Sequence, residues 1–414
     1  MSPDSRDPKR TSPGGGLVFD WNGGEDSAAP QVSLLDETLR DGLQSPSVRY
    51  PGIEQKIVAL ERMSAAGIEF ANLGLPSTSA RAFEDVLEMC RAIARLKLAI
   101  RPVCAGRTVA GDVAAIVEVS ERAEIAVEAS LFIGSSALRT TAEGWDLPLL
   151  LRRTENAIDQ ARAAGLAVTF VSEDTTRSQP DTLRALFSKA IERGATRICL
   201  CDTVGFATPP GVTALVRFAR EVVGQDVGID WHGHDDRGLA LANALIARRA
   251  GADRLHATAL GIGERVGNTA MELLLLNLWL AGAERPLAPV AAYCAHFADV
   301  LGVPIPDHHP LVGRNAFRTA TGVHAAAIVK AQGKDAWLAD HVYGLLSPSQ
   351  IGAALAIDVG QMSGSSNVQH WLRRHGFEPS EPLLKALLER AKGAERVLTD
   401  EELLSVVERV RGSL

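Results

Sequence analysis

Two histidines separated by one residue, His232 and His234, are followed directly by Asp235 and Asp236. Residues 227–231 before them are short, largely apolar and partly β-branched, which predicts a buried strand. Alternate residues of a strand point to the same side, so the two imidazoles are expected to project together. Such a pair beside carboxylates suits a divalent cation. On this motif alone, two hydrogen-bonded histidines at a strand end are an equally good interpretation.

A second polar segment, LRDGLQSP at 39–46, follows the first predicted strand and places Arg40 beside Asp41. Adjacent charges in a loop usually form an ordinary ion pair. The functional interpretation gives the Asp41 carboxylate to a cation and leaves Arg40 to meet developing negative charge. With the two histidines, Asp41 completes a set of two imidazoles and one carboxylate that leaves positions open for substrate oxygens.

A glycine-rich segment, GIGERVGNT at 261–269, follows the last predicted strand. A glycine loop alone is usually only a turn. Here the loop is expected beside the histidine pair, so the side-chain oxygen of Asn268 is a further candidate ligand for the same cation.

Short apolar runs alternate with helical segments from about residue 31 to residue 285. The predicted strands are 32–35, 70–74, 99–104, 125–132, 167–171, 197–201, 227–231 and 254–259. Helical segments such as 54–66, 147–164, 180–193 and 239–250 lie between them, and several end at a glycine. Eight strands with intervening helices over roughly 250 residues predict an α/β fold, the (β/α)8 TIM barrel. A doubly wound open sheet is the alternative, but no G-x-G-x-x-G follows the first strand.

A barrel requires functional side chains at the carboxyl ends of its strands. Polar residues follow the predicted strands in this way: Arg40 and Asp41, Asn72, Ser135 and Ser136, Glu173, Asp202 and Thr203, His232 and His234, and the segment 261–268. A random scatter of polar residues would not coincide with the strand ends so regularly.

The chain is predicted to have three parts. Residues 1–30 are rich in Ser, Pro, Gly and charge, which is typical of a flexible tail. Residues 31–285 form the barrel. Residues 286–414 carry several prolines and charged helical stretches, which predict a smaller, mostly helical C-terminal module.

The composition argues against several classes of protein. The formal net charge is -7, and no block of Lys and Arg suggests nucleic-acid binding. No apolar run is long enough to span a bilayer, and no signal segment begins the chain, so neither membrane insertion nor secretion is expected. Five cysteines, sparsely spread and without a C-x-x-C motif, fit a cytoplasmic protein better than a disulfide framework.

At this point a family resemblance is plain. The chain resembles the DRE-TIM metallolyases, within the Claisen-condensing branch of 2-isopropylmalate, citramalate and homocitrate synthases. The matching motifs are LRDGLQSP at 39–46, SEDTTR at 172–177, CDTVGFATP at 201–209, HGHDDRGLALAN at 232–243, GIGERVGNT at 261–269, TGVHAAAI at 321–328 and GQMSGSSNV at 360–368. Together they extend over about residues 32 to 370.

The resemblance implies a role for each matching residue in the barrel. A divalent cation (Mg²⁺, Mn²⁺ or Zn²⁺) would be held by Asp41, His232 and His234, with Asn268 close to it. Arg40 would stabilise the oxyanion, and Thr203 would bind the carboxylate of a 2-oxo acid. Gln44 and Ser135 are expected to contact the substrate, and Glu173 to line the same pocket as a catalytic residue.

The resemblance also implies roles for two residues after the barrel. His324 and Tyr343 match a catalytic His and Tyr that this branch contributes to the neighbouring subunit's site. The implied assembly is therefore a homodimer whose active sites are completed in trans.

The implied activity is the condensation of acetyl-CoA with a small 2-oxo acid to give a 2-alkylmalate and CoA. A 2-isopropylmalate synthase-like enzyme is favoured. Citramalate, homocitrate and specialised alkylmalate synthases are alternatives, and a hydroxymethylglutaryl-CoA-lyase-type carbon–carbon lyase is an alternative of another class. That lyase type carries a cysteine in the loop matching 261–268, which has none here. A non-catalytic metal-binding scaffold would leave Arg40, Thr203 and His324 unexplained.

Several positions depart from the family pattern and bear on the identity of the 2-oxo acid. Asn72 stands where a glutamate is usual, Ser130 where a histidine is usual, and Leu43 where most synthases have an acidic or small residue. Arg139 is either an ordinary surface arginine or a partner for a second acidic group on the substrate, and the former is favoured. The long C-terminal regulatory domain of leucine-inhibited synthases has no counterpart, so feedback by that route is not expected.

Overall fold

The computed structural model describes residues 16–19, 21, 22 and 31–412. Their contacts divide them into two compact units. One unit comprises residues 31–305, and the other comprises residues 306–412 with the described residues of the N-terminal segment. Most of the tail predicted at 1–30 lies outside the described residues.

The first unit is built on a closed barrel of eight parallel strands. They are β1 (Ser33–Asp36), β2 (Phe70–Asn72), β3 (Arg101–Arg107), β4 (Glu128–Gly134), β5 (Ala167–Glu173), β6 (Arg197–Asp202), β7 (Gly228–Gly233) and β8 (Arg254–Ala257). The strands pair in chain order, and β8 pairs with β1 through Ser33 opposite Arg254. The predicted barrel is confirmed.

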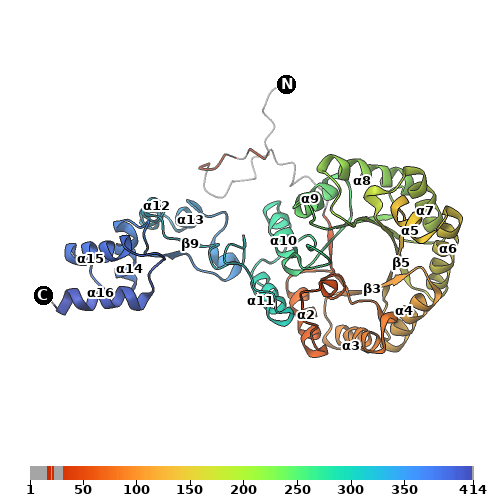
Figure 1. The fold of residues 1–414 in the computed structure, drawn as a ribbon, viewed down its shortest axis with the longest axis horizontal. Coiled ribbons are helices and arrows are strands. Elements are labelled where there is room, and N and C mark those ends of the chain that lie inside the picture. The colour runs from red at the N-terminus through yellow and green to blue at the C-terminus, as the bar shows by residue number, and fades with distance from the viewer. Residues whose placement is uncertain (1–15, 20, 23–30, 413–414) are drawn as a thin grey trace, which may run out of the picture. The chain divides into compact units, whose positions relative to one another are not determined.

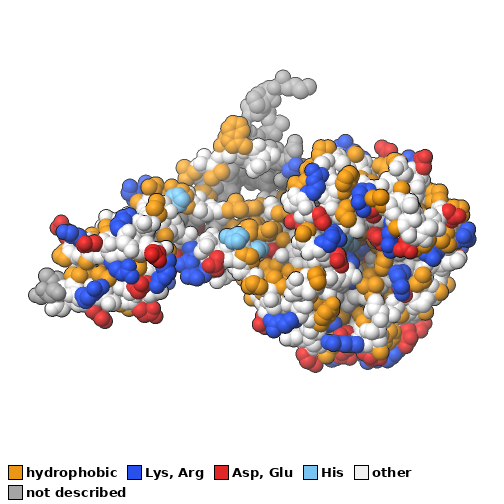
Figure 2. Space-filling model, viewed as in Figure 1, with side chains coloured by type: hydrophobic (Ala, Val, Ile, Leu, Met, Phe, Trp, Pro, Cys, Tyr) orange, Lys and Arg blue, Asp and Glu red, His pale blue; other side chains and the backbone are white. Residues whose placement is uncertain are grey.

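Helices surround the barrel as a ring (Figure 1). They are α2 (Ile53–Ala65), α3 (Ala80–Leu96), α4 (Ala110–Ala123), α5 (Ala137–Glu143), α6 (Leu147–Ala163), α7 (Pro180–Glu192), α8 (Pro209–Val223), α9 (Ala240–Ala250), α10 (Met271–Leu280) and α11 (Val290–Leu301). Single 3-10 turns follow four strands or their loops: η1 (Gly42–Gln44), η2 (Pro76–Thr78), η3 (Thr175–Arg177) and η4 (Ala259–Gly261). Figure 2 shows acidic and basic side chains intermixed over the visible face of this unit.

The glycines predicted to end helices do so through the left-handed conformation. Gly67, Gly194 and Gly251 have φ of 74°, 93° and 108°. A side chain is strained at such φ values, whereas glycine adopts them freely. The chain can therefore leave each helix within one residue and enter the next strand.

α11 belongs to the barrel unit, although the predicted boundary at residue 285 placed it in the C-terminal module. Its Tyr293 hydroxyl donates to Asp36 Oδ2 at 2.5 Å, and His296 Nε2 lies 2.9 Å from the Gln55 carbonyl of α2. Tyr293 is completely buried, so this contact is part of the core. The two units divide at residues 305 and 306 instead of 285 and 286.

The C-terminal unit is mostly helical. Its elements are β9 (Arg318–Thr319), α12 (Gly322–Gln332), α13 (Ala336–His341), η5 (Pro348–Ile351), β10 (Ala356–Ile357), α14 (Ser365–Arg374), α15 (Glu381–Lys392) and α16 (Asp400–Gly412). Leu372, Leu387 and Leu403, one from each of the last three helices, meet in its apolar core. Among the described residues of both units, no helix is long and apolar enough to cross a membrane.

The amino end of the barrel interior holds a buried ion network. Arg254 of β8 donates from Nε to Asp230 Oδ2 at 2.7 Å and from Nη2 to Glu128 Oε1 at 2.6 Å, and its guanidinium lies 4.5 Å from the Phe70 ring centroid. Burial opposes charge on Asp230, but Arg254 and Arg197 hold its pKa far below the usual value. Each charge in the network is therefore compensated inside the barrel.

We expect Arg254→Met to lower the free energy of unfolding by about 3–5 kcal/mol, because it leaves the buried Asp230 and the partly buried Glu128 short of their partner. Urea unfolding followed by circular dichroism measures the loss. Arg101→Met is the matched control, since exposed Arg101 also lies over Phe70, at 5.2 Å, but pairs with neither carboxylate. Equal losses in the two variants would contradict a stabilising role for the ion network.

Candidate active site at the carboxyl end of the barrel

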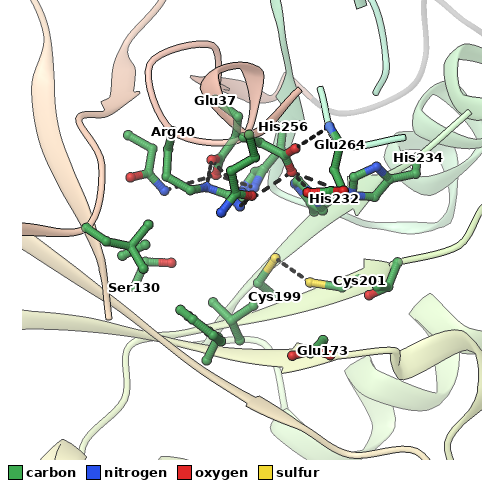
Figure 3. A pocket seen from close by; sticks show the side chains of 18 of the residues that line it. Glu37, Arg40, Ser130, Glu173, Cys199, Cys201, His232, His234, His256 and Glu264 are labelled. Carbon is green, nitrogen blue, oxygen red and sulfur yellow. Dashed lines mark hydrogen bonds and ion pairs between the residues drawn. The ribbon is translucent and has the colours of Figure 1, made fainter. Parts of the chain in front are cut away.

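A cavity of about 330 Å³ opens at the carboxyl ends of the strands. Seven of the residues predicted for a site line it: Arg40, Asp41, Gln44, Glu173, Thr203, His232 and His234. In Figure 3, Glu37, Arg40, His232, His234, His256 and Glu264 lie along one side, with Ser130, Cys199, Cys201 and Glu173 across from them. The barrel thus gathers into one cavity side chains that are up to 228 positions apart in the chain, from Glu37 to Arg265.

Asp41, His232 and His234 direct their ligand atoms to one point. Asp41 Oδ2 lies 3.3 Å from His232 Nε2 and 3.5 Å from His234 Nε2, and the two Nε2 atoms are 3.3 Å apart. All three side chains are buried. The histidines occupy the last part of β7 and the residue just after it, so the alternation of the strand directs both rings to the same side.

Asn268 lies next to this cluster. A backbone bridge pairs residue 268 with His234, which aligns the loop after β8 with the end of β7. Both polar atoms of the buried Asn268 amide lack a partner in the structure. A Cβ at Gly263 would lie 2.0 Å from Asn268 Nδ2 and 3.1 Å from Asp41 Oδ1, so only glycine leaves room there. Since unpartnered buried amides are rare, the unsatisfied Asn268 amide is suited to contact a cation held at this point.

The protonation states of the cluster also fit a cation. Burial opposes ionisation of Asp41, but the neighbouring Arg40 and the His232 imidazole hold its pKa well below the usual range. Burial, followed by the proximity of His232, lowers the pKa of His234 to about 4. A charged carboxylate and a neutral imidazole are the forms that bind metal. The donor set of two nitrogens, one carboxylate and one amide suits a divalent cation.

A second cluster shares His232 but is less suited to a cation. Glu37, His232 and His256 also place their ligand atoms close together. Glu37 Oε2, however, accepts from Arg40 Nε at 2.6 Å, and His256 Nε2 lies 3.1 Å from Asp230 Oδ2. Because these two groups already have charged partners, we favour the Asp41 cluster as the cation site.

Arg40 is held in place by its neighbours. Its Nε and Nη2 contact Glu37, while Nη1 lies 3.4 Å from both Asp41 Oδ2 and Gln44 Oε1. Glu37 in turn accepts from Asn72 Nδ2 at 3.2 Å. The guanidinium therefore stands beside the candidate cation site with a fixed orientation, as stabilisation of a developing oxyanion requires.

Glu37 and His256 were not among the predicted site residues. Glu37 directly follows β1 and precedes the matching segment 39–46, and it was not assigned a role. His256 is two residues from Arg254 on β8, so the alternation of that strand could have indicated its inward direction. Their mutual contact, His256 Nδ1 to Glu37 Oε1 at 3.3 Å, arises only when β8 closes on β1.

Of the remaining predicted barrel residues, Thr203 and Glu173 line the cavity and Ser135 does not. Thr203 lines the cavity, and its Oγ1 accepts the Asp174 backbone N–H at 2.8 Å. Glu173 lines it with 31% of its side chain exposed. Ser135 does not line the cavity, because its buried hydroxyl bonds to those of Ser172 and Ser178, both at 2.7 Å.

His324 and Tyr343 lie together in the C-terminal unit. Their rings stack with centroids 3.9 Å apart and planes at 25°. Tyr343 is 51% exposed, and Val323, Leu345 and Met362 are exposed apolar side chains of the same unit. Exposed apolar groups of this size are typical of surfaces that contact another molecule.

Comparisons with known proteins agree with this architecture. The family model described as HMGL-like matches residues 31–292. A homocitrate synthase from Methanopyrus kandleri is 32% identical over 387 residues, which are 92% of both chains. A protein named "Probable 2-isopropylmalate synthase" from Ignicoccus hospitalis is 29% identical, again over 92% of both chains. Among solved structures, an HMG-CoA lyase from Brucella melitensis has a TM-score of 0.55 at 20% identity, covering 66% of this chain and 99% of its own, which shows a common fold.

We expect His232→Ala to weaken the binding of Mn²⁺ to chelator-treated protein by more than about 100-fold, because it removes one of the three side chains that would bind the cation. Isothermal titration calorimetry measures the affinity, and circular dichroism tests that the variant is folded. His296→Ala serves as the control, because His296 contacts the Gln55 carbonyl outside the cavity. An unchanged affinity in folded His232→Ala would contradict the assignment.

Proposed function

We propose that this chain, which belongs to the HMGL-like family, condenses acetyl-CoA with a 2-oxo acid to give a 2-alkylmalate and CoA. The observation that carries the proposal is the convergence of Asp41, His232 and His234 beside Arg40 in one cavity. A 2-oxo acid offers a keto oxygen and a carboxylate oxygen, which are suited to a cation with open coordination positions. The synthase names of the relatives support the same reaction class.

In the proposed reaction, Asp41, His232 and His234, with Asn268 beside them, would hold a divalent cation, which would polarise the keto group of the 2-oxo acid. Thr203 orients the carboxylate of the 2-oxo acid. A base removes a proton from the acetyl methyl group, and His324 is the candidate. The resulting enolate attacks the keto carbon, while Arg40 stabilises the negative charge that develops on the keto oxygen. Hydrolysis of the thioester then releases CoA.

The cavity walls favour a 2-oxo acid with an apolar side chain. Leu75, Ala105, Phe132 and Val171 contribute apolar surface to the cavity. Glu173 adds a carboxylate, which would repel a second acidic group on the substrate. A 2-isopropylmalate synthase-like reaction therefore fits better than a homocitrate synthase-like reaction, whose substrate is a diacid.

The lyase alternative has less support. The barrel likeness to HMG-CoA lyases, at 20% identity, concerns the fold. Residues 261–268 contain no cysteine that could act as the lyase cysteine does. Cys199 and Cys201 line the cavity but are buried on β6.

We further propose a homodimer in which the C-terminal unit of one subunit completes the site of the other. His324 and Tyr343 lie stacked and accessible, with exposed apolar side chains at the neighbouring positions 323, 345 and 362. A second copy of this chain would cover that surface and bring a base to the cavity.

The activity is tested by thiol release from acetyl-CoA with 2-oxoisovalerate, pyruvate, 2-oxoglutarate, phenylpyruvate and a phosphonate-bearing 2-oxo acid. We expect the highest kcat/KM with 2-oxoisovalerate and loss of turnover on chelation. Arg40→Met should reduce kcat by about 10²–10³-fold, because it removes an oxyanion-stabilising group. No thiol release with any of the five acids would reject the synthase proposal.

The shared site is tested by mixing two inactive variants, Arg40→Ala and His324→Ala. Half of the randomly mixed dimers would be heterodimers with one intact site each, so we expect about a quarter of the wild-type activity. Native mass spectrometry verifies the exchange of subunits. Confirmed heterodimers without activity would exclude a site completed in trans.

A further inference from the structure

We propose that Arg139 of α5 is a positioning residue that holds the Glu173 carboxylate at the cavity wall in its charged form. The interaction itself is a feature of the fold, while its effect on turnover rests on the proposed function. The sequence left Arg139 as either a surface arginine or a partner for a second acid on the substrate. Arg139 is a surface arginine, as favoured, with 43% of its side chain exposed, but its guanidinium also contacts Glu173 at the cavity.

The Arg139 guanidinium already contacts two carboxylates of the protein itself, those of Glu143 and Glu173. Arg139 Nη1 lies 2.8 Å from Glu143 Oε1, and Nε lies 3.5 Å from Glu173 Oε1. The guanidinium also lies over the Trp145 ring, 5.7 Å from its centroid. One positive charge between two negative charges leaves a net negative group, which does not attract a further anion.

The backbone directs Arg139 toward Glu173. Ser136 caps α5 by accepting the Arg139 backbone N–H at 3.2 Å, which places Arg139 in the first helical turn. Gly134, the last residue of β4, pairs directly with Glu173 of β5. A Cβ at Gly134 would lie 2.3 Å from Arg139 Cγ. The absence of a side chain at residue 134 therefore makes the space through which the Arg139 stem reaches Glu173.

Arg139 lowers the pKa of the Glu173 carboxyl, whereas the other groups around it and its burial raise that pKa. Burial raises the pKa of the Glu173 carboxyl above its usual value, and the negative charges of Asp174 and Glu143 act in the same direction. Among the charged groups near Glu173 in the described part of the chain, Arg139 favours ionisation, while Asp174 and Glu143 oppose it. Removing its charge should raise the pKa of Glu173 further, so that more of the carboxyl is protonated at a given acidic pH.

Arg139→Met tests this inference against Arg122→Met, a closely matched control. Both arginines are 43% exposed, pair with a glutamate four residues away on their own helix and lie over an aromatic ring, Phe83 in the case of Arg122. Arg122 lies on α4 and does not line the cavity. The two variants therefore differ in the contact with Glu173.

The first measurement follows the titration of the Glu173 carboxyl by ¹³C NMR of glutamate-labelled holoenzyme, with the signal assigned through Glu173→Gln. We expect the midpoint to rise by about half a unit to one unit in Arg139→Met, a modest shift because the pair is partly exposed. The midpoint should not change in Arg122→Met. Gly134→Ala should shift it in the same direction as Arg139→Met, and Arg139→Lys should restore most of the wild-type value. An unshifted midpoint in Arg139→Met overturns the inference, whether or not the enzyme shows synthase activity.

The second measurement is the pH profile of kcat/KM for thiol release. We expect the acid limb to move to higher pH in Arg139→Met by the same amount as the NMR midpoint, with rates that approach those of Arg122→Met above the limb. A shifted NMR midpoint with an unshifted acid limb would overturn the catalytic consequence. A shifted midpoint in a protein that releases no CoA with any 2-oxo acid would support the positioning role and reject the proposed function.

Discussion

The pairing of β8 with β1 is the constraint on which the cavity depends. It joins residues near position 35 to residues near position 255, and in doing so brings the Arg40–Asp41 loop beside His256 and the glycine loop after β8. Without closure, the carboxylate from the start of the domain and the imidazoles from its end would belong to opposite edges of an open sheet. The barrel thus converts distant positions in the chain into one set of ligand atoms.

Charged side chains form two connected groups inside the barrel, one at the amino end and one at the carboxyl end. At the amino end, Arg254 neutralises Asp230 and Glu128, and His256 connects Asp230 to Glu37. At the carboxyl end, Glu37 fixes Arg40 beside Asp41. A buried carboxylate with a charged partner is stable, whereas an isolated one is not. The orientation of Arg40 is therefore linked, through named contacts, to the ion network that stabilises the interior.

The sequence predicted much of this because the strongest signals are local. The alternation of strands and helices located all eight strands, and the spacing of His232 and His234 indicated that their rings share a side. What it missed depends on contacts between distant segments. The hydrogen bonds of Ser135 to Ser172 and Ser178 could not be foreseen, because a strand pattern cannot tell which neighbouring hydroxyls will meet, and its contact with the substrate stays a prediction. The place of α11 in the barrel unit follows from Tyr293 reaching Asp36, a pairing separated by 257 positions.

The bridge between His234 and Asn268 has a consequence for how proteins of this architecture diverge. It joins the loops after β7 and β8 to each other. Only glycine at position 263 leaves room for the Asn268 amide. Mutations in those two loops must therefore be mutually compatible, while Leu75, Ala105 and Phe132 line the cavity from β3, β4 and the loop after β2, none of which carries a ligand of the candidate cation site. Substitutions at such positions can therefore change the substrate preference while the cation ligands stay the same.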